Sequence, residues 1–225
     1  FSPNEPKIKE SEVMTKYFIT IAGNIGVGKS TLVRLLAERN GWEPVYEAVT
    51  ENPYLADFYK DMRRWAFQSQ VFFLSRRLQQ HYYLLQQPQS IIQDRSVYED
   101  AEIFARNLFE QGDMSERDWT CYQDLYQTLS LLLRPPDLVI YLSASVSTLR
   151  RRISSRGRAY EKGITDSYLE RLNGFYESWS AEFSLSPVLT IDTNGLDYVQ
   201  HEEHLEIIWQ KIDHRLHGKD YLALS

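Results

Sequence analysis

A glycine-rich segment near the N-terminus carries the residue types that bind a polyphosphate. It reads Gly-Asn-Ile-Gly-Val-Gly-Lys-Ser over residues 23–30, after an apolar run and before an amphipathic segment. In a loop of this spacing, backbone N–H groups wrap the phosphates, the lysine reaches the β- and γ-phosphates and the hydroxyl ligates Mg²⁺. The segment therefore predicts a nucleoside triphosphate site with Lys29 on phosphate and Ser30 on metal. Its predicted phosphate-binding residues are Gly23, Asn24, Ile25, Gly26, Val27, Gly28, Lys29, Ser30 and Thr31.

Charged residues that follow two other apolar runs are suited to phosphoryl transfer. Glu47 follows the run that ends at Tyr46 and is placed to accept a proton from an attacking hydroxyl, with a solvated loop acid as the alternative. Asp94, Arg95 and Ser96 follow a second run. There the acid can order Mg²⁺ and its water, and the arginine can stabilise charge on the transferring phosphoryl. The alternative is that Asp94 and Ser96 only cap a helix.

A long helical segment carries an amide and an arginine on one face. Gln70 and Arg77 are seven residues apart, which is nearly two full turns, and aromatic residues lie near them. Such a face suits the edge of a heterocycle, with Asp100 holding the arginine in place. The alternative is that Arg77 and Asp100 form only a structural salt bridge.

Five arginines in nine residues occupy the segment 150–158 at the end of a predicted helix. Basic residues are common at helix C-termini because they complement the helix dipole. The density of these arginines and the turn at Gly157 indicate more, namely a mobile segment that closes arginines over phosphates.

Short apolar runs alternate with segments of helical spacing along the chain. This order predicts an α/β fold in which parallel strands carry helices on both faces and ligands bind at the carboxyl ends of the strands. The predicted strands are 17–22, 43–46, 90–93, 138–142 and 188–191. The predicted helices include 64–85, 99–110 and 116–133.

Composition limits the class of protein and of ligand. The chain has 225 residues, 43% of them hydrophobic and 25% charged, and no apolar run near the roughly 20 residues that span a bilayer. We therefore expect a soluble protein that is not a membrane protein. A net charge of −6 argues against a nucleic-acid surface and favours a small ligand. With no linker in the sequence, we expect a leader over residues 1–15 and one domain over 16–218.

Cysteine and histidine usage gives no metal or disulfide framework. Cys121 is the single cysteine, so a reducing, cytoplasmic compartment fits, and we interpret it as a small core residue. The histidines occur late in the chain beside acidic residues, except His81, and all are interpreted as surface residues. They are His81, His201, His204, His214 and His217.

In combination these motifs closely resemble the deoxynucleoside kinase family. The resemblance covers about residues 17–179 and rests on blocks that keep family order and spacing. The blocks are Gly23–Ser30, Glu47, Trp65-x-Phe67-x-x-Gln70, Asp94–Asp100 and Arg156-Gly157-Arg158-x-x-Glu161. The resemblance implies transfer of the γ-phosphoryl of ATP to the 5′-hydroxyl of a deoxynucleoside. It further implies a P-loop kinase fold with a five-stranded parallel sheet, an arginine-rich lid, Mg²⁺, and usually a homodimer.

The same resemblance implies roles for individual residues. Glu47 resembles the general base, although the usual Glu-Pro-Val reads Glu47-Ala48-Val49 here. Arg95 resembles the arginine that contacts the 5′ oxygen and the phosphoryl group, and Asp94 resembles the acid near the metal. The predicted catalytic residues are therefore Glu47, Arg95 and Lys29.

The resemblance also implies which residues bind the two substrates. The acceptor residues comprise a pair for the sugar 3′-hydroxyl, Tyr59 and Glu161, and a base-reading set, Gln70, Arg77 and Asp100. The lid arginines that grip donor phosphates are Arg152, Arg156 and Arg158.

The charged pair Arg77 and Asp100 indicates the acceptor base. In the family such a pair accompanies adenine, guanine or cytosine, whereas members that prefer thymidine have uncharged residues there. We therefore expect deoxyadenosine first, with deoxycytidine and deoxyguanosine as further acceptors, in deoxynucleotide salvage. A nucleoside monophosphate kinase is the close alternative, but Glu47 would repel an acceptor phosphate. A non-catalytic structural subunit of the same fold is the other, although it would be free to lose the catalytic residues that this chain retains.

Overall fold

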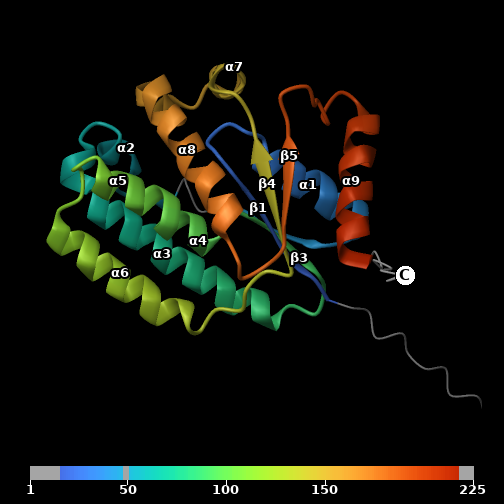
Figure 1. The fold of residues 1–225 in the computed structure, drawn as a ribbon, viewed down its shortest axis with the longest axis horizontal. Helices are drawn as coiled ribbons and strands as arrows, with labels where there is room; N and C mark the ends of the chain where they lie inside the picture. The colour runs from blue at the N-terminus through green and yellow to red at the C-terminus, as the bar shows by residue number, and fades with distance from the viewer. Residues whose placement is uncertain (1–15, 48–50, 218–225) are drawn as a thin grey trace, which may run out of the picture.

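Five strands form one parallel sheet at the centre of the molecule (Figure 1). The computed structural model describes residues 16–47 and 51–217, so the predicted leader lies outside the described residues. The strand order is β2-β3-β1-β4-β5, and all four neighbouring pairs are parallel. The strands are β1 Phe18–Gly23, β2 Glu43–Val45, β3 Ile91–Asp94, β4 Leu138–Ser143 and β5 Val188–Asp192. The five predicted strands and the α/β class are confirmed.

The central strands are buried along their whole length because helices cover both faces of the sheet. Every residue of β1 and β3 is buried, as expected for inner parallel strands. The register pairs Ile21 of β1 with Asp94 of β3, and Gly23 of β1 with Leu142 of β4. The carboxyl ends of these strands therefore lie together at one edge of the sheet.

The helices form two layers. Figure 1 shows α1 and α9 on one side of the sheet and α3, α5, α6 and α8 on the other. The described helical segments are α1 Lys29–Asn40, α2 Leu55–Phe58, α3 Met62–Gln86, α4 Val97–Glu99, η2 Asp100–Ala105, α5 Arg106–Glu110, α6 Glu116–Ser130, α7 Val146–Arg156, η3 Ala159–Gly163, α8 Asp166–Glu182 and α9 Glu202–His217. Within the described part of the chain, no helix has the length and apolar character needed to cross a bilayer.

The predicted helix 99–110 is in fact three segments. The α-helical turn α4 is followed by the π-helical segment η2 and then by α5. A π-helical turn widens the backbone hydrogen bonds from i→i−4 to i→i−5, and such turns often occur at functional sites. Here it carries Asp100 and Phe104, which both line the site described below.

Two single-residue predictions were wrong. Cys121 is exposed on α6, and the buried position beside it is taken by Tyr122, whose side chain is fully buried. His81 is not on the surface but 9% exposed on α3. Its Nε2 accepts a hydrogen bond from the Arg134 amide at 2.9 Å, and burial together with the charge of Arg134 lowers the pKa of the ring.

Candidate active site

The glycine-rich segment forms the connection between β1 and α1. Gly23, Gly26 and Gly28 have φ of 144°, 83° and 113°, which side chains rarely adopt. At Gly26 a Cβ would also lie 2.6 Å from Ile153 Cγ1 of α7, so the loop packs closely against that helix. The Lys29 ammonium donates to the carbonyl oxygens of Gly23 at 2.8 Å and Asn24 at 3.1 Å, inside the loop. Burial and the charge of Arg95 lower the pKa of Lys29 to about 8.

Ser30 and Asp94 meet where α1 begins and β3 ends. The Ser30 hydroxyl donates to Asp94 Oδ2, and Asp94 is 3% exposed. Asp94 Oδ1 is buried and has no hydrogen-bond partner among the described residues. A hydroxyl and a carboxylate with an unsatisfied oxygen fit the oxygen ligands that Mg²⁺ takes from proteins. The described residues hold no cluster of three or more His, Cys, Asp or Glu suited to a metal, so bound phosphate and water would supply its other ligands.

Glu47 lies just after β2 and is held by two buried arginines. Its Oε1 accepts from Arg95 Nη1 at 3.1 Å and from Arg77 Nη2 at 3.0 Å. Burial alone would raise the pKa of this carboxyl, but the two guanidinium charges outweigh burial and hold it below its ordinary value. Glu47 is therefore ionised at neutral pH. Residue 48, where the sequence departs from the family pattern, lies outside the described residues.

Arg95 occupies a backbone conformation that is unfavourable for an arginine. Its φ is 67°, and it is the non-glycine residue with positive φ in the described part of the chain. The strain of such a conformation is tolerated only where surrounding contacts impose it, typically at a functional site. The guanidinium lies 4.2 Å from the centre of the Phe104 ring, which stabilises it as a cation–π contact.

A cavity of about 280 Å³ extends from the P-loop to α3. Glu47 and Arg95 lie in its wall, and so do the sugar-binding and base-reading candidates Tyr59, Gln70, Asp100 and Glu161. Gln70 is 4% exposed, and its Oε1 has no hydrogen-bond partner among the described residues. Burial raises the pKa of Tyr59, so its hydroxyl stays protonated. The cavity thus combines an unsatisfied amide, carboxylates and aromatic rings.

Arg77 lies behind this wall rather than in it. Its Nε donates to Asp100 at 2.8 Å and its Nη1 to the Asp94 carbonyl at 3.1 Å, in addition to the bond to Glu47. It lines a small separate cavity on the far side, next to His81. The predicted pair with Asp100 therefore exists, and the same arginine also positions the carboxylate of Glu47.

The arginine-rich segment is the C-terminal part of α7 and the turn that follows it. Arg156 forms a bidentate pair with Glu161: its Nε donates to Oε2 at 2.9 Å and its Nη2 to Oε1. Arg158 Nη1 lies 3.8 Å from the same carboxylate. Both arginines lie where the 280 Å³ cavity meets a second one of about 650 Å³, bounded by the P-loop, α7 and residues 194–200.

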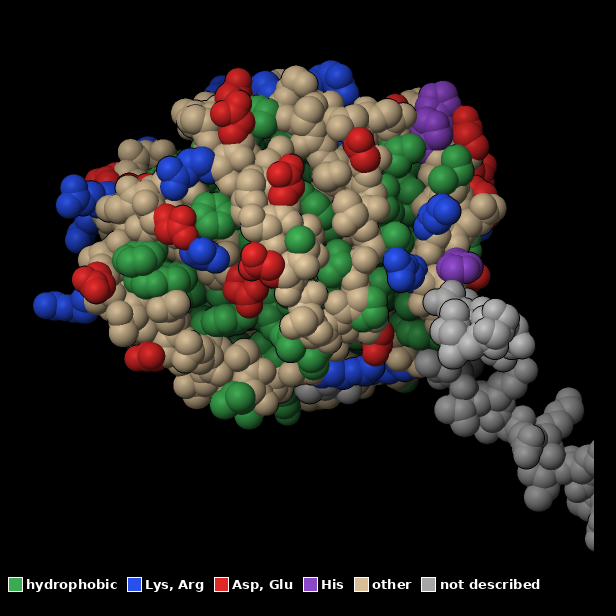
Figure 2. Space-filling view, viewed as in Figure 1, with side chains coloured by type: hydrophobic (Ala, Val, Ile, Leu, Met, Phe, Trp, Pro, Cys, Tyr) green, Lys and Arg blue, Asp and Glu red, His purple; other side chains and the backbone are tan. Residues whose placement is uncertain are grey.

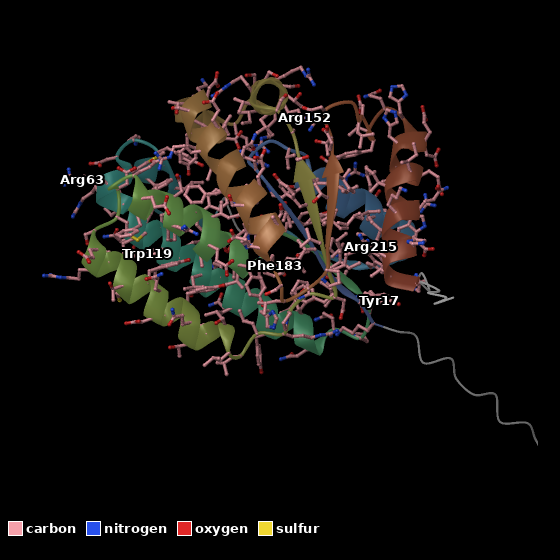
Figure 3. The ribbon with its side chains drawn as sticks, in the orientation of Figure 1. Tyr17, Arg63, Trp119, Arg152, Phe183 and Arg215 are labelled. Atoms are coloured by element: carbon pink, nitrogen blue, oxygen red, sulfur yellow. The ribbon has the colours of Figure 1, made fainter. Side chains whose placement is uncertain are left out.

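Arg152 differs from the other two predicted lid residues. Figure 3 shows it near the carboxyl ends of β4 and β5. Its guanidinium donates to the carbonyl oxygens of Val27 at 2.8 Å, Thr193 at 2.8 Å and Leu196 at 3.2 Å. It also donates to the Thr193 hydroxyl at 3.0 Å. Arg152 therefore joins the P-loop to the loop after β5.

Comparison with known proteins identifies the family. The deoxynucleoside kinase family model matches residues 19–217. This chain belongs to the deoxynucleoside kinase family. Among relatives, the deoxyadenosine/deoxycytidine kinase of Bacillus subtilis is 36% identical over 214 residues, which cover 93% of this family member and 98% of that protein. Human deoxycytidine kinase is 33% identical over 221 residues, covering 78% and 83% of the two chains.

Solved structures agree with this deoxynucleoside kinase assignment. Deoxyadenosine kinase from M. mycoides with bound dATP has a TM-score of 0.76 at 32% identity, over 88% of this chain and 99% of that one. The same enzyme with dCMP and dCDP bound also has a TM-score of 0.76, at 34% identity over 87% and 98%.

Two residues that contact the site of this family member were not predicted from the sequence. Glu99 accepts a hydrogen bond from the Gly23 amide at 3.2 Å. The only sequence signal for Glu99 was its position three residues after Ser96, a spacing typical of a helix start. The Tyr198 hydroxyl donates to the Gly28 carbonyl at 3.2 Å from a loop that carries no motif.

Proposed function

We propose that this chain transfers the γ-phosphoryl of ATP to the 5′-hydroxyl of a deoxynucleoside, with deoxyadenosine as the preferred acceptor. The observation that carries the proposal is the ionised carboxylate of Glu47, 12% exposed, in one cavity with Lys29 and Ser30 of the P-loop. A fixed negative charge favours a neutral hydroxyl acceptor, which it can deprotonate, and disfavours a phosphate acceptor.

The proposed reaction uses residues that line this cavity. The 5′-oxygen attacks the γ-phosphorus, its proton passes to Glu47, and the bond to the β–γ bridging oxygen breaks, so that ADP leaves. Arg95 and Lys29 stabilise the charge that develops on the transferring oxygens. Arg95 is anchored by Glu47 and by the Phe104 ring, so little reorganisation is needed during transfer. Mg²⁺ held by Ser30 and Asp94 would neutralise charge on the β- and γ-phosphates.

The base-reading end of the cavity supports an acceptor with an exocyclic amine. The unsatisfied oxygen of Gln70 needs a donor, and the carboxylate of Asp100 can only accept. Adenine and cytosine both present an amine next to a ring-nitrogen acceptor, and an amide can pair with both groups at once. The M. mycoides deoxyadenosine kinase, determined with dATP and with dCMP, is consistent with acceptance of both bases.

The donor triphosphate is proposed to occupy the 650 Å³ cavity next to the P-loop. Arg156 and Arg158 lie at the boundary of the two cavities, where they can reach the phosphates. Arg152, whose guanidinium is already bound by three carbonyls, is proposed to shape this cavity instead of gripping phosphate.

The test is kcat/KM with ATP for the four deoxynucleosides and for dAMP. We expect deoxyadenosine to rank first, thymidine last, and dAMP to give no product. Phosphorylation of dAMP in preference to deoxyadenosine would favour a monophosphate kinase. A folded protein that turns over none of the five would favour the non-catalytic subunit.

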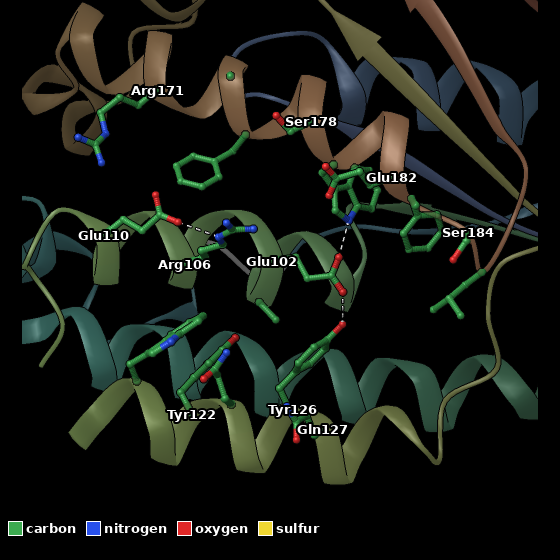
Figure 4. A pocket seen from close by; sticks show the side chains of 18 residues that line it. Glu102, Arg106, Glu110, Tyr122, Tyr126, Gln127, Arg171, Ser178, Glu182 and Ser184 are labelled. Carbon is green, nitrogen blue, oxygen red and sulfur yellow. Dashed lines mark hydrogen bonds and ion pairs between the residues drawn. The ribbon is translucent and has the colours of Figure 1, made fainter. Parts of the chain in front are cut away.

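We further propose that the protein is cytoplasmic and forms a homodimer. The proposed dimer contact is the groove between η2, α6 and α8. The groove has a volume of about 970 Å³ (Figure 4). Figure 2 shows hydrophobic side chains gathered in the band between these helices, with charges of both signs at its border. Glu102 accepts from Tyr126 at 2.6 Å and from Trp179 at 2.8 Å, so the groove floor is preformed. Charges of both signs suit a self-complementary two-fold contact.

Light scattering on the purified chain tests this dimer. Leu185 lines the groove and is 56% exposed, whereas Ile207 is 52% exposed on α9, away from it. We expect Leu185→Glu to yield monomers and Ile207→Glu to leave the dimer intact. A monomeric wild-type chain, or equal effects of the two variants, would contradict the proposal.

A further inference from the structure

We propose that Glu99 is a positioning residue that fixes Arg95 and the P-loop relative to each other for phosphoryl transfer. The inference rests on the proposed function, because it assigns Glu99 a part in that reaction. Glu99 does not line the substrate cavity and so acts through the residues it contacts.

Glu99 is a fully buried carboxylate that receives hydrogen bonds from three parts of the fold. Its exposed fraction is 0%. Oε2 accepts from the Gly23 amide of the P-loop at 3.2 Å and from the Tyr176 hydroxyl of α8 at 2.7 Å. Oε1 accepts from the amide and hydroxyl of Ser96, at 2.8 and 3.3 Å. A buried carboxylate is costly unless donors satisfy it, so its four donors are held in fixed relation to one another.

One of these contacts controls the entry to the P-loop. Gly23 packs against β4 so closely that a Cβ there would lie 2.6 Å from the Leu142 carbonyl oxygen. The Gly23 carbonyl in turn accepts from the Lys29 ammonium at 2.8 Å. Glu99, Gly23 and Lys29 therefore form a continuous chain of contacts from α4 to the cation that faces the donor phosphates.

The other contacts control Arg95. The bond to the Ser96 amide fixes the peptide directly after Arg95, whose φ of 67° must be imposed by its surroundings. Arg95 Nε is buried without a hydrogen-bond partner among the described residues, and it lies 3.9 Å from Glu99 Oε2. Glu47 contacts the Nη1 of the same guanidinium at 3.1 Å. Arg95 is thus held between two carboxylates, one in the cavity and one behind it.

A helix cap alone does not account for this arrangement. In a capping box, an acid three residues after the cap returns one bond to the cap amide, and Oε1 of Glu99 makes that bond. The contacts of Oε2 with Gly23 and Tyr176 lie outside the helix that Glu99 caps. The contact with Gly23 joins the P-loop to the turn that carries Arg95, whereas the contact with Tyr176 only satisfies the buried carboxylate.

The experiment is a double-mutant cycle on kcat with ATP and deoxyadenosine. Glu99→Gln replaces an acceptor oxygen by an amide donor that faces other donors. We expect it to lower kcat by about 10- to 100-fold, since a misplacement of about 1 Å can cost roughly 100-fold, and to leave the deoxyadenosine KM within about threefold. Tyr176→Phe removes one contact of Glu99 and keeps those with Gly23 and Ser96, so its kcat is expected within about threefold of wild type.

The decisive measurement is the effect of Glu99→Gln on kcat in protein that also carries Arg95→Lys. If Glu99 acts partly through the Arg95 guanidinium, Glu99→Gln lowers kcat by a clearly smaller factor there than in the wild-type background, and the loss that remains comes from the Gly23 contact. An equal loss in both backgrounds, or a wild-type kcat for Glu99→Gln, would overturn the proposal. Should Glu99→Gln fail to fold, Glu99→Asp serves in its place, because the shorter carboxylate keeps its charge but cannot reach Ser96 and Gly23 together. The wild-type chain is measured alongside, and its inactivity would refute the proposed function instead.

Discussion

Replacement of Glu47 by glutamine separates its charge from its shape. The amide oxygen of Glu47→Gln can still accept from Arg95 and Arg77, so the side chain keeps its place. It loses the negative charge and the ability to take a proton from the acceptor hydroxyl. We therefore expect kcat to fall by about 10²- to 10⁴-fold, the range for loss of a general base, with ATP affinity nearly unchanged.

The same substitution is expected to lower the free energy of unfolding, by an amount that follows from the contacts of Glu47. Both guanidiniums donate to Oε1, at 3.0 and 3.1 Å, and both are buried. Charge-assisted hydrogen bonds exceed neutral ones by roughly 1 kcal/mol each, so loss of the charge should lower the free energy of unfolding by about 2 kcal/mol. Arg77 keeps Asp100 as a partner, which limits the loss.

Urea unfolding and steady-state kinetics on matched variants measure both effects. Glu43→Gln is the control, because Glu43 begins the strand that precedes Glu47 but contacts Gln89 at 3.1 Å, outside the cavity. We expect Glu43→Gln to change kcat by less than about threefold. Turnover of Glu47→Gln within tenfold of wild type would refute the role of Glu47 as base, and an unchanged free energy of unfolding would refute the electrostatic reasoning.

Three further predictions follow from single residues. Gln70→Leu should raise the free energy of unfolding by about 1 kcal/mol in urea titration, because it removes a buried unpaired oxygen. The same variant should lower kcat/KM for deoxyadenosine at least about tenfold. An unchanged kcat/KM would contradict the role of Gln70 in base binding. Arg95→Gly should be more stable than Arg95→Ala by about 1 kcal/mol, since only glycine adopts a φ of 67° without strain, and the reverse order in urea would contradict it. Because the folded-state pKa of Glu47 lies below its ordinary value of 4.5, its stabilising contribution is present above that pH and is lost as the pH falls through the folded-state pKa. The difference in unfolding free energy between wild type and Glu47→Gln should therefore stay constant from pH 5 to 8 and shrink only below about 4.5; a decline between pH 6 and 5 would contradict the lowered pKa.

The parts of the fold that sequence patterns predicted are those set by local chemistry. Runs of apolar residues give buried parallel strands, and three glycines at fixed spacing give the loop between β1 and α1. Helix α3 begins two residues before its predicted start, because the Asp61 side chain accepts from the Arg64 amide and caps it there. Such signals reside within a few residues of the feature that they specify.

The features that escaped prediction depend on contacts between distant segments. Arg77 shares a helix face with Gln70, yet the depth that places it behind Glu47 depends on how α3 packs against β2 and β3. Arg152 lies one helical turn before Arg156, but carbonyls 41 and 125 residues away determine its contacts. The π-helical segment carries an apolar pattern that an α-helix would also satisfy. No local pattern distinguishes these alternatives.

At position 95, selection for folding and selection for phosphoryl transfer favour different residues. Position 95 combines a left-handed conformation, which glycine or asparagine adopts at low cost, with a guanidinium that neither residue supplies. A library randomised at this codon and sorted for folding alone should therefore become enriched in residues other than arginine. The same library sorted for growth that depends on phosphoryl transfer should retain arginine. The two enrichments, read at one codon, would measure how much foldability this family member gives up for its reaction.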